Sequence, residues 1–559
     1  MGTLLEHLRL IGHSYHGSAC TDILLDDIVG NKLIGPMPGR PGARSAKQGE
    51  GSAVHLTELA AATPAKPALV MADGSHTLTY GELDSRSCQV SRLLAAEGVS
   101  AGDHVAVLMP NRPEYLEIAW GCQRRGTYWT PVNWHLTAEE ADYIVEDCCA
   151  RVLFASAETR DIAARIHARR PDLGLFIVGA DGRDDTSYEQ ALAAWSAAPP
   201  EGEVEGMYFL YSSGTTGRPK GILRRSAFPP FGTGIGLEAL MSTRFGFSQD
   251  TVYLCPGPLY HAAPIGWSMG TIRLGGTVVL MDRFDPVGCL RAIERYSVTA
   301  AQFVPTHFVR LLKLPGAERA LFDVSSLRTV VHAAAPCPVE VKQRMISWLG
   351  PVLWEYYAGS EGNGLTMVGS AEWLSRPGTV GRAARGTVHI VDEDGTEVPP
   401  GEDGTVYFED GGSFEYHNDP VKTANSRDFR GWSTLGDIGH LDTDGYLYLS
   451  DRRTDLIISG GVNIYPAEVE NALVMHPGVT DIAVIGVPDA DMGQSVLAVV
   501  QPADTTISSD QLAAELIAYC RGRLAGYKCP RAVVFATELP RTPAGKLQRR
   551  RLREQWAGA

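Results

Sequence analysis

The stretch YSSGTTGRPKG, residues 211–221, combines residue types that bind phosphate. Its glycines let backbone N–H groups approach an anion, its hydroxyl side chains add donors, and Lys220 adds a positive charge. The stretch follows an apolar run, MYFLY, so we expect it at the carboxyl end of a strand, where α/β proteins place ligands. It is not a Walker loop, because Pro219 separates Arg218 from Lys220 and a glycine follows the lysine. Composition alone fits a polar surface turn equally well, since Gly and Ser dominate ordinary turns.

Four further stretches carry side chains suited to a nucleotide, a cation or a carboxylate. In YYAGSEG, the ring of Tyr357 suits a purine and the carboxylate of Glu361 suits a hard cation. In GWSTLGD, the lone pairs of Asp437 suit hydroxyl groups. His261 stands in PGPLYHAAP, and Lys546 stands in PRTPAGK near the carboxyl end. Each has an ordinary alternative: a solvated carboxylate, a turn aspartate, a core histidine with its hydrogen bonds satisfied, or a solubilising lysine.

Together, these stretches resemble the motifs of the adenylate-forming superfamily, which includes acyl-CoA synthetases, aryl-CoA ligases, luciferases and peptide-synthetase adenylation domains. The resemblance extends from about Leu78 to Leu552. YSSGTTGRPKG is similar to the phosphate loop, YYAGSEG to Y-G-x-T-E, GWSTLGD to W-x-x-T-G-D and PRTPAGK to P-x-T-x-x-G-K. PGPLYHAAP, HAAAP and GTYWTPVNWHL resemble further family segments, and SDRRTDLIISGGVNIYPAEVE resembles the family's hinge and the start of its small domain. This set of matches in the family's order is far more specific than one glycine-rich loop.

The resemblance implies a role for each matched residue. It implies ATP or AMP binding by Ser212, Ser213, Gly214, Thr215, Thr216, Gly217, Lys220, Ala335, Tyr357, Ser360, Glu361, Asp437, Arg452, Asn463 and Lys546. It implies catalysis by Lys546, His261, Thr216 and Glu361, with Mg²⁺ held by Glu361 and Thr216. It implies a CoA passage along Gly460 and Gly461, and an acyl pocket at His261, Trp267, Ala333 and Ala334.

The chain departs from the family's motifs at several positions. Ala358 replaces a glycine and Ser360 replaces a threonine, and these changes keep the small size and the hydroxyl group. Leu435 stands where the family usually has a threonine before the Gly-Asp pair. His332 replaces a small residue, and Thr454 stands at the hinge position, which is usually Asp or Lys.

The distribution of apolar runs predicts an α/β fold. Short apolar strands alternate with helical stretches up to about residue 385, which indicates parallel sheets covered on both faces. Short strands with Asp-Gly turns follow, as in antiparallel hairpins, and helix–strand alternation then resumes. We expect a flexible extension over residues 1–53, with a misassigned start codon as the alternative. A large AMP-binding domain with parallel sheets and a small β-barrel-like subdomain follows over 54–451, and a small, mobile α+β domain over 452–559.

Bulk composition narrows the possible partners and locations. With 50 Lys and Arg against 65 Asp and Glu, the net charge is −15, which disfavours nonspecific nucleic-acid binding. Ten scattered cysteines without C-x-x-C spacing predict buried, reduced thiols and a cytoplasmic setting. We find no signal peptide and no apolar run long enough to cross a membrane. The sequence leaves the oligomeric state open, a homodimer included.

The resemblance implies that ATP activates a carboxylic acid as an acyl-adenylate, from which CoA takes the acyl group. No fused carrier-protein motif L-G-G-x-S-L is found, which favours free CoA over another acceptor. Mostly apolar side chains around the pocket segments favour a hydrophobic acid that is fatty, alicyclic or steroid-like, with an aryl acid as the alternative. A non-catalytic adenylate-binding protein is the alternative from another class, but we would expect it to lack Lys546 or Glu361, and both are present.

Overall fold

The structure is a computed structural model that describes residues 55–180, 187–212, 218–452, 455–460, 462–489, 491–504, 506, 508–541 and 547–556. The chain divides into two compact units, Met1–Glu50 and Gly51–Ala559. The first unit, with nearly all of the expected extension, lies outside the described residues. Every element described below belongs to the second unit.

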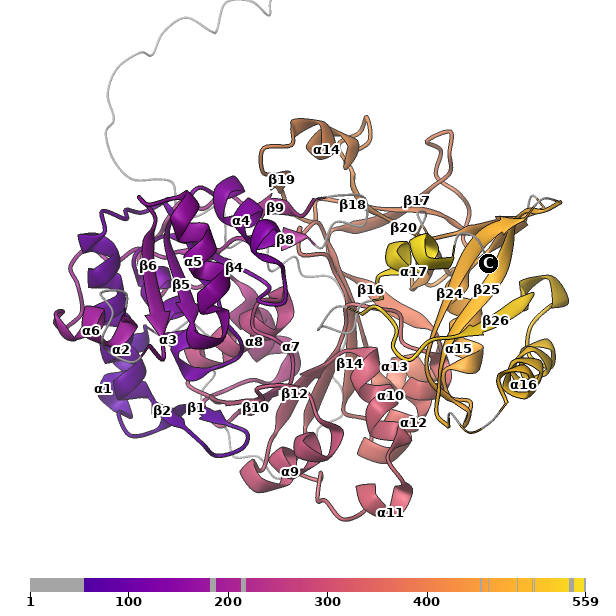
Figure 1. The fold of residues 1–559 in the computed structure, drawn as a ribbon, viewed down its shortest axis with the longest axis horizontal. Coiled ribbons are helices and arrows are strands. Elements are labelled where there is room, and N and C mark those ends of the chain that lie inside the picture. Colours follow the sequence, from indigo (N-terminus) through magenta and orange to yellow (C-terminus); the bar gives the residue numbers. More distant parts are fainter. Residues whose placement is uncertain are drawn as a thin grey trace, which may run out of the picture. The chain divides into compact units, whose positions relative to one another are not determined.

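A five-stranded parallel sheet follows the amino-terminal helices. Its strands, in spatial order, are β6 (Gly174–Val178), β5 (Ala150–Ser156), β3 (His104–Leu108), β4 (Tyr128–Pro131) and β7 (Met207–Tyr208). The helices in this part of the chain are α2 (Tyr80–Ala96), α3 (Pro113–Arg124), α4 (Ala138–Asp147), α5 (Arg160–Arg169) and α6 (Tyr188–Ala193), with a 3-10 turn at Ala157–Thr159. Helices α4 and α5 pack against β5 (Figure 1). Most residues of β3, β4, β5 and β6 are buried, as expected for parallel strands covered on both faces, whereas β7 is half-buried.

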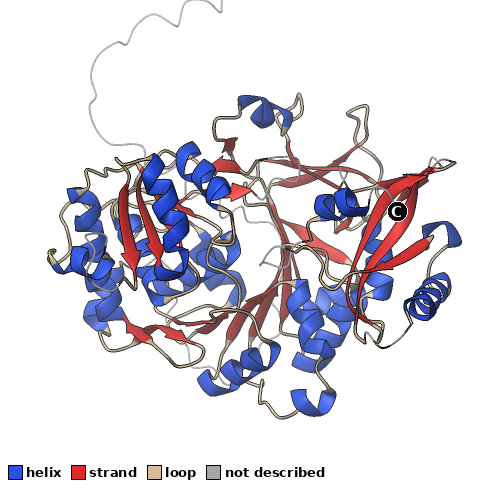
Figure 2. Ribbon diagram, in the orientation of Figure 1, coloured by secondary structure: helices blue, strands red, loops and turns tan. Residues whose placement is uncertain are grey.

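A thirteen-stranded sheet runs through the rest of the large part of the chain (Figure 2). Its parallel strands are β14 (Leu353–Tyr357), β13 (Thr329–His332), β12 (Ala300–Phe303), β10 (Val252–Cys255), β11 (Thr277–Leu280) and β1 (Pro67–Met71), with β2 (Thr77–Thr79) antiparallel at the edge. Its helices are α1 (Leu56–Ala62), α7 (Leu237–Phe245), α8 (Ala262–Arg273), α9 (Pro286–Tyr296), α10 (Pro305–Lys313), α11 (Gly316–Arg319), α12 (Val339–Leu349) and α13 (Ser370–Ser375).

The same sheet continues as antiparallel strands beyond β14. These are β15 (Leu365–Gly369), β16 (Thr379–Arg385), β21 (Leu447–Arg452), β20 (Ser433–Leu441), β18 (Gly404–Glu409) and β17 (Thr387–Val391). Gly395 and Gly445, the glycines of two Asp-Gly turns, have φ of 82° and 80°, in the left-handed region that favours glycine. The expected change from parallel sheets to antiparallel hairpins is therefore confirmed.

A small antiparallel sheet carries the phosphate-loop candidate. Its strands are β19 (Glu415–Tyr416), β9 (Lys220–Leu223) and β8 (Leu210–Ser212), followed by α14 (Pro420–Asn425). The apolar run MYFLYSS reads as one strand in the sequence, but the structure divides it at Phe209. Residues before Phe209 pair in parallel with β4 and residues after it pair with β9, because the hairpin to β9 supplies a second set of backbone partners.

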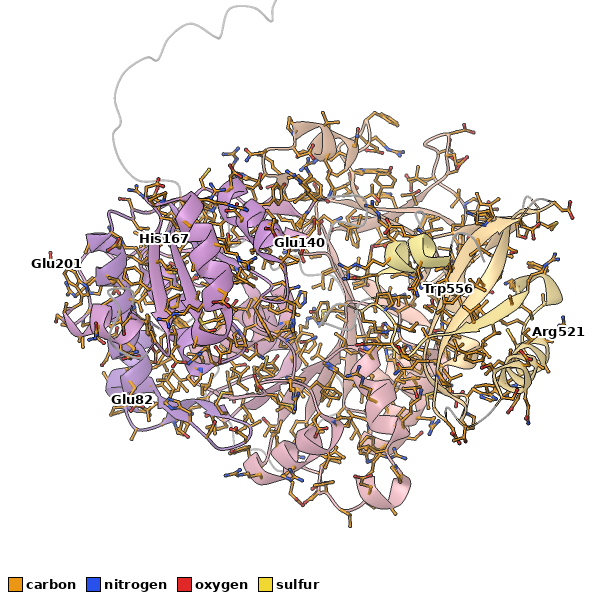
Figure 3. The ribbon with its side chains drawn as sticks, viewed as in Figure 1. Glu82, Glu140, His167, Glu201, Arg521 and Trp556 are labelled. Atoms are coloured by element: carbon orange, nitrogen blue, oxygen red, sulfur yellow. The ribbon has the colours of Figure 1, made fainter. Side chains whose placement is uncertain are left out.

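The carboxyl-terminal part forms its own sheet and core. Its strands are β23 (Val462–Ile464), β22 (Ile457–Ser459), β25 (Gly493–Pro502), β24 (Val479–Asp489) and β26 (Ala532–Phe535). Its helices are α15 (Pro466–Leu473), α16 (Ser509–Arg521) and α17 (Arg549–Trp556), with a 3-10 turn at Gly526–Lys528. Helix α17 packs against β24, and Trp556 lies at its end (Figure 3).

Two sequence-based expectations concern the cysteines and membrane-spanning helices. The nine described cysteines are free, and seven of them are buried, as the lack of metal-site spacing predicts. Within the described ranges, every helix falls short of the length and apolar character that a membrane crossing requires.

Candidate functional site

The hairpin of β8 and β9 frames the phosphate-loop candidate. Ser212 lies opposite Lys220 in the antiparallel register, and the backbone N–H of Lys220 donates to Ser212 Oγ over 3.4 Å. The residues between them, Ser213, Gly214, Thr215, Thr216 and Gly217, lie outside the described part of the chain. Lys220 Nζ lies 3.0 Å from Asp419 Oδ2, and this hydrogen bond raises the pKa of the lysine. Lys220, the expected phosphate ligand, is therefore held in place by the carboxylate of Asp419.

Asp419 connects this lysine to the next element. Its side chain caps α14, where Oδ1 accepts from the Lys422 backbone N–H at 2.9 Å. The hydrogen bonds from Lys422 N–H and Lys220 lower the pKa of Asp419. The Lys422 ammonium lies 4.0 Å from the centre of the Tyr416 ring, and burial lowers its pKa although Glu361 opposes the shift. Lys220, Asp419 and Lys422 thus form a charged group that borders Glu361.

Glu361 is half-buried and oriented by Tyr416, whose hydroxyl donates to Oε1 over 2.9 Å. Gly359 makes room for this carboxylate: a Cβ on Gly359 would lie 2.8 Å from Glu361 Oε2 and 2.5 Å from Leu435 Cδ1. Leu435, which departs from the family's threonine, packs against the glycine. The lack of a side chain at Gly359 therefore leaves room for Leu435, which is larger than the family's threonine.

Tyr357 and Asp437, two expected nucleotide ligands, come from separate strands and meet through a hydrogen bond. The Tyr357 hydroxyl donates to Asp437 Oδ2 over 2.6 Å, and only 7% of Asp437 is exposed. Arg452 is the register partner of Asp437 across β20 and β21, but its side chain lies outside the described part of the structure. Ser360, next in the loop, is exposed. The structure thus brings together a ring suited to a purine and a carboxylate suited to the ribose hydroxyls.

The expected acyl side is aromatic. His261 precedes α8 as its N-cap residue, and its ring centre lies 4.5 Å from that of Tyr260. Trp267 lies on α8 and is 3% exposed. Its ring stacks on Tyr356 with the centres 6.3 Å apart. The rings that surround Trp267 come from Phe245, Phe247, Tyr253 and Tyr356. Because Tyr356 and Tyr357 are consecutive on a strand, their side chains face opposite sides of it. Tyr356 packs with the aromatic group around Trp267, and Tyr357 contacts Asp437.

The loop after β13 carries the three alanines of HAAAP. Ala333 is buried, whereas Ala334 and Ala335 are exposed. Ala334 has a φ of 76°, an unfavourable value for a residue with a Cβ and one that clusters at functional sites. His332, which replaces a small residue, is fully buried behind this loop and lies 3.7 Å from the Glu355 carboxylate. Burial and the nearby Lys342 hold the pKa of His332 well below its ordinary value.

The small carboxyl-terminal part contributes fewer described site residues. Gly460 has a φ of 57°, in the left-handed region that favours glycine, and a Cβ there would collide with Met492 Cε, at the end of a flexible side chain. Asn463 is exposed on β23. Gly461, Thr454 and Lys546 lie outside the described residues. Two described arginines near Lys546 in the sequence form ion pairs, Arg541 with Asp481 at 2.6 Å and Arg549 with Glu470 at 2.7 Å.

The carboxylates present suit a magnesium ion that arrives with its nucleotide. No group of three or more His, Cys, Asp or Glu side chains among the described residues could hold a metal ion by itself. Mg²⁺ commonly binds through one or two carboxylates and substrate phosphates while it keeps several waters. Glu361, with one oxygen fixed by Tyr416, fits that requirement.

Some residues that shape the site were not found by sequence reasoning. Tyr416, Asp419 and Lys422 all fall in the segment EYHNDPVKTAN, which carries no motif that we singled out. The one available signal was Asp419 followed by proline, which marks the start of a helix with an aspartate cap. The pairing of Asp419 with Lys220 joins positions far apart in the sequence and could not be read from either motif.

Comparison with known proteins identifies the family. The AMP-binding enzyme family matches residues 56–415, and the AMP-binding enzyme C-terminal domain matches residues 468–546. Feruloyl-CoA synthase of Amycolatopsis sp is 36% identical over 491 residues, which cover 86% of this chain and 95% of that protein. Long-chain-fatty-acid–CoA ligase FadD13 of Mycobacterium tuberculosis is 31% identical over 514 residues, which cover 90% and 98%.

Solved structures agree with this identification. ATP-bound MatB from Rhodopseudomonas palustris superimposes with a TM-score of 0.75 at 29% identity, over 90% of this chain and 99% of that one. Anthranilate CoA ligase AuaEII in complex with anthranoyl-AMP superimposes with a TM-score of 0.77 at 25% identity, over 90% and 97%. The chain therefore belongs to the AMP-binding enzyme family within the adenylate-forming superfamily, as an acyl-CoA synthetase that works as an AMP-forming acid–thiol ligase.

Proposed function

We propose that this ligase activates a compact, hydrophobic carboxylic acid that carries a ring, aryl or alicyclic, and transfers it to CoA. The observation that carries the proposal is the position of Trp267. The residue falls in the segment that the family resemblance assigns to the acyl pocket, and four aromatic rings pack around it. A large, fixed side chain there occupies space that a long chain would need, while flat aromatic faces favour a ring.

The relatives support the same acid class. Feruloyl-CoA synthase and anthranilate CoA ligase both have names that indicate an aromatic acid. A ligase from Rhodococcus jostii, 32% identical over 513 residues, is named for a fused-ring propanoate. A long-chain fatty acid is the second candidate, because FadD13 shares 31% identity with this chain.

The proposed reaction uses the residues by position and charge. A carboxylate oxygen attacks the α-phosphorus of ATP, pyrophosphate leaves, and the CoA thiol then displaces AMP from the acyl-adenylate. Asp437, oriented by Tyr357, holds the ribose, and Lys220 with the loop hydroxyls binds the departing phosphates. A bound Mg²⁺, held by Glu361 and Thr216, would neutralise phosphate charge. Lys546 stabilises the charge that develops between the acid and the α-phosphate.

We further infer that residues 54–451 and 452–559 act as two catalytic parts that change their arrangement between the half-reactions. Such a movement would withdraw Lys546 after adenylation and admit CoA past Gly460 and Gly461. The change Lys546→Ala should abolish adenylation while it largely spares thioester formation from a supplied acyl-adenylate. The control is Arg550→Ala, which removes an exposed cation of the same tail that pairs with Glu554. Equal losses in both half-reactions would refute the role of Lys546.

The substrate class is tested by pyrophosphate release with a panel of acids, with and without CoA. The panel contains a cinnamate-type acid, an alicyclic acid, and octanoate and palmitate. We expect the highest kcat/KM with ring acids, and we expect Trp267→Ala to shift the preference towards longer chains. If the wild-type enzyme prefers palmitate, the proposed ring-acid substrate is wrong and a long-chain fatty acid is the substrate class. Formation of no AMP with any acid would indicate a non-catalytic adenylate-binding protein.

A further inference from the structure

Two arginines that no motif assigns lie beside the loop of Glu361. Arg224 directly follows β9, and Arg385 ends β16. Arg385 Nη2 donates to the carbonyl oxygen of Gly362 over 2.5 Å. A Cβ built on Gly362 would lie 3.4 Å from Arg385 Nη2 and 3.5 Å from Arg224 Nη1, so both guanidinium groups crowd the residue that follows Glu361.

Neither guanidinium group forms an ion pair within the part of the chain that the structure describes. Arg224 lies over the ring of Tyr208, 5.5 Å from its centre, and among the described residues the Arg385 side chain donates only to the carbonyl oxygen of Gly362. Burial and the nearby charge of Arg224 lower the pKa of Arg385. Two like charges this close repel each other unless an anion lies between them.

Two arginines near them serve as a comparison. Arg225, next to Arg224, lies 2.9 Å from Glu415, and Arg382, on the strand of Arg385, donates to the Asp444 carbonyl over 2.8 Å and lies over Tyr446. Arg225 therefore has a carboxylate partner, whereas Arg224 and Arg385 have none among the described residues. Around Glu361, the cations Lys220, Lys422, Arg224 and Arg385 outnumber the carboxylates Glu361 and Asp419.

We propose that Arg224 and Arg385 form a phosphate-binding site for a phosphorylated substrate of the ligase. Guanidinium groups offer planar, forked donors that match phosphate oxygens, and two of them suit a group with more than one negative charge better than a single carboxylate. The reaction supplies such a group from two sources, the pyrophosphate portion of ATP and the phosphates of CoA. This site rests on the proposed ligase reaction and adds a contact that the family's motifs do not contain.

The test compares the single changes Arg224→Gln and Arg385→Gln and the double variant with the controls Arg225→Gln and Arg382→Gln. KM for ATP, CoA and the acid is measured separately, together with product inhibition by pyrophosphate. We expect the double variant to raise one phosphate-dependent constant tenfold or more, and each control to stay within twofold of wild type. A joint change for ATP and pyrophosphate identifies ATP as the source, whereas a change for CoA alone identifies CoA.

The proposal fails if no phosphate-dependent constant changes by more than twofold, if the controls change equally, or if only the KM of the acid rises. The double variant Arg224→Lys and Arg385→Lys retains both charges, so its constants should lie between those of wild type and the glutamine variant. Calorimetric titration of each protein with pyrophosphate gives a readout without turnover. If wild type lacks ligase activity but binds pyrophosphate and the glutamine variant does not, the proposed function fails and the phosphate site stands.

Discussion

Removal of either partner of the buried ion pair between Lys342 and Glu355 should strongly destabilise the protein. Lys342 Nζ lies 2.5 Å from Glu355 Oε2, and the two residues are 0% and 5% exposed. Burial raises the pKa of Glu355 even though Lys342 opposes the shift, which shows how poorly this environment tolerates charge. The ammonium also lies 4.7 Å from the centre of the Trp373 ring.

The expected magnitude follows from the burial. A change that removes one member of a buried pair leaves the other charge uncompensated and typically costs about 3–5 kcal/mol, while replacement of both by apolar residues is often neutral or stabilising. We therefore expect Lys342→Met and Glu355→Leu each to lower the free energy of unfolding by about 3 kcal/mol or more. The double variant should recover most of that loss, so the pair should show a large coupling energy.

The same helix offers a matched control. Arg344 and Glu340 form an exposed pair on α12 at 3.4 Å, with side chains 42% and 56% exposed. Exposed helical pairs contribute about 0.3–0.5 kcal/mol, so Arg344→Met should change stability by less than about 1 kcal/mol. Urea unfolding followed by tryptophan fluorescence and far-UV circular dichroism measures all five proteins. If Lys342→Met destabilises no more than Arg344→Met, or if the double variant shows additive losses, the reasoning is wrong.

Three further predictions concern binding, pH and packing. Tyr357→Phe removes the donor that orients Asp437, so KM for ATP should rise about tenfold, as expected for a hydrogen bond to a charged group; an unchanged KM would contradict this. Burial lowers the pKa of His307 from 6.5 to about 3. Between these pH values the histidine is protonated in the unfolded protein but neutral in the folded protein, so the free energy of unfolding should fall as the pH drops from 6.5 towards 3. His307→Gln should flatten that part of the stability curve, and equal slopes would count against it. Gly411→Ala would force a Cβ into a neighbouring backbone carbonyl and should cost about 1–3 kcal/mol, whereas Gly316→Ala, in open space, should be nearly neutral by thermal unfolding.

Much of the fold could be predicted because its signals are local. The helix Tyr80–Ala96 begins where Thr79 and Glu82, three residues apart, complete a capping box that the sequence displays. Apolar runs became strands, and Asp-Gly pairs became turns. The one strand that divided, MYFLYSS, did so at Phe209 because two different partner strands were available, and no local pattern records which partner a strand will find.

The sequence names candidate site residues one motif at a time, and their nucleotide contacts stay predictions. Tyr357, Glu361 and Asp437 each stand in a recognisable stretch, and the structure places Tyr357 beside Asp437. The charged neighbours were not predictable in this way. Lys220 and Asp419 are about two hundred residues apart, and only the pairing of β9 with β19 brings their segments together.

A weaker signal for the buried ion pair was nevertheless present. Lys342 stands on the same face of its helix as Ile346 and Leu349, at helical spacings of four and seven residues, where only apolar residues are expected. A lysine on a buried face needs a counter-charge, so its presence predicts that an acid lies opposite. Thirteen residues later, Glu355 is a charged residue in an otherwise apolar strand, which is equally unexpected. Such paired anomalies reveal a contact that neither residue predicts alone. Here Glu355 lies on β14, the strand of Tyr357, and its register partner His332 immediately precedes the loop of Ala334.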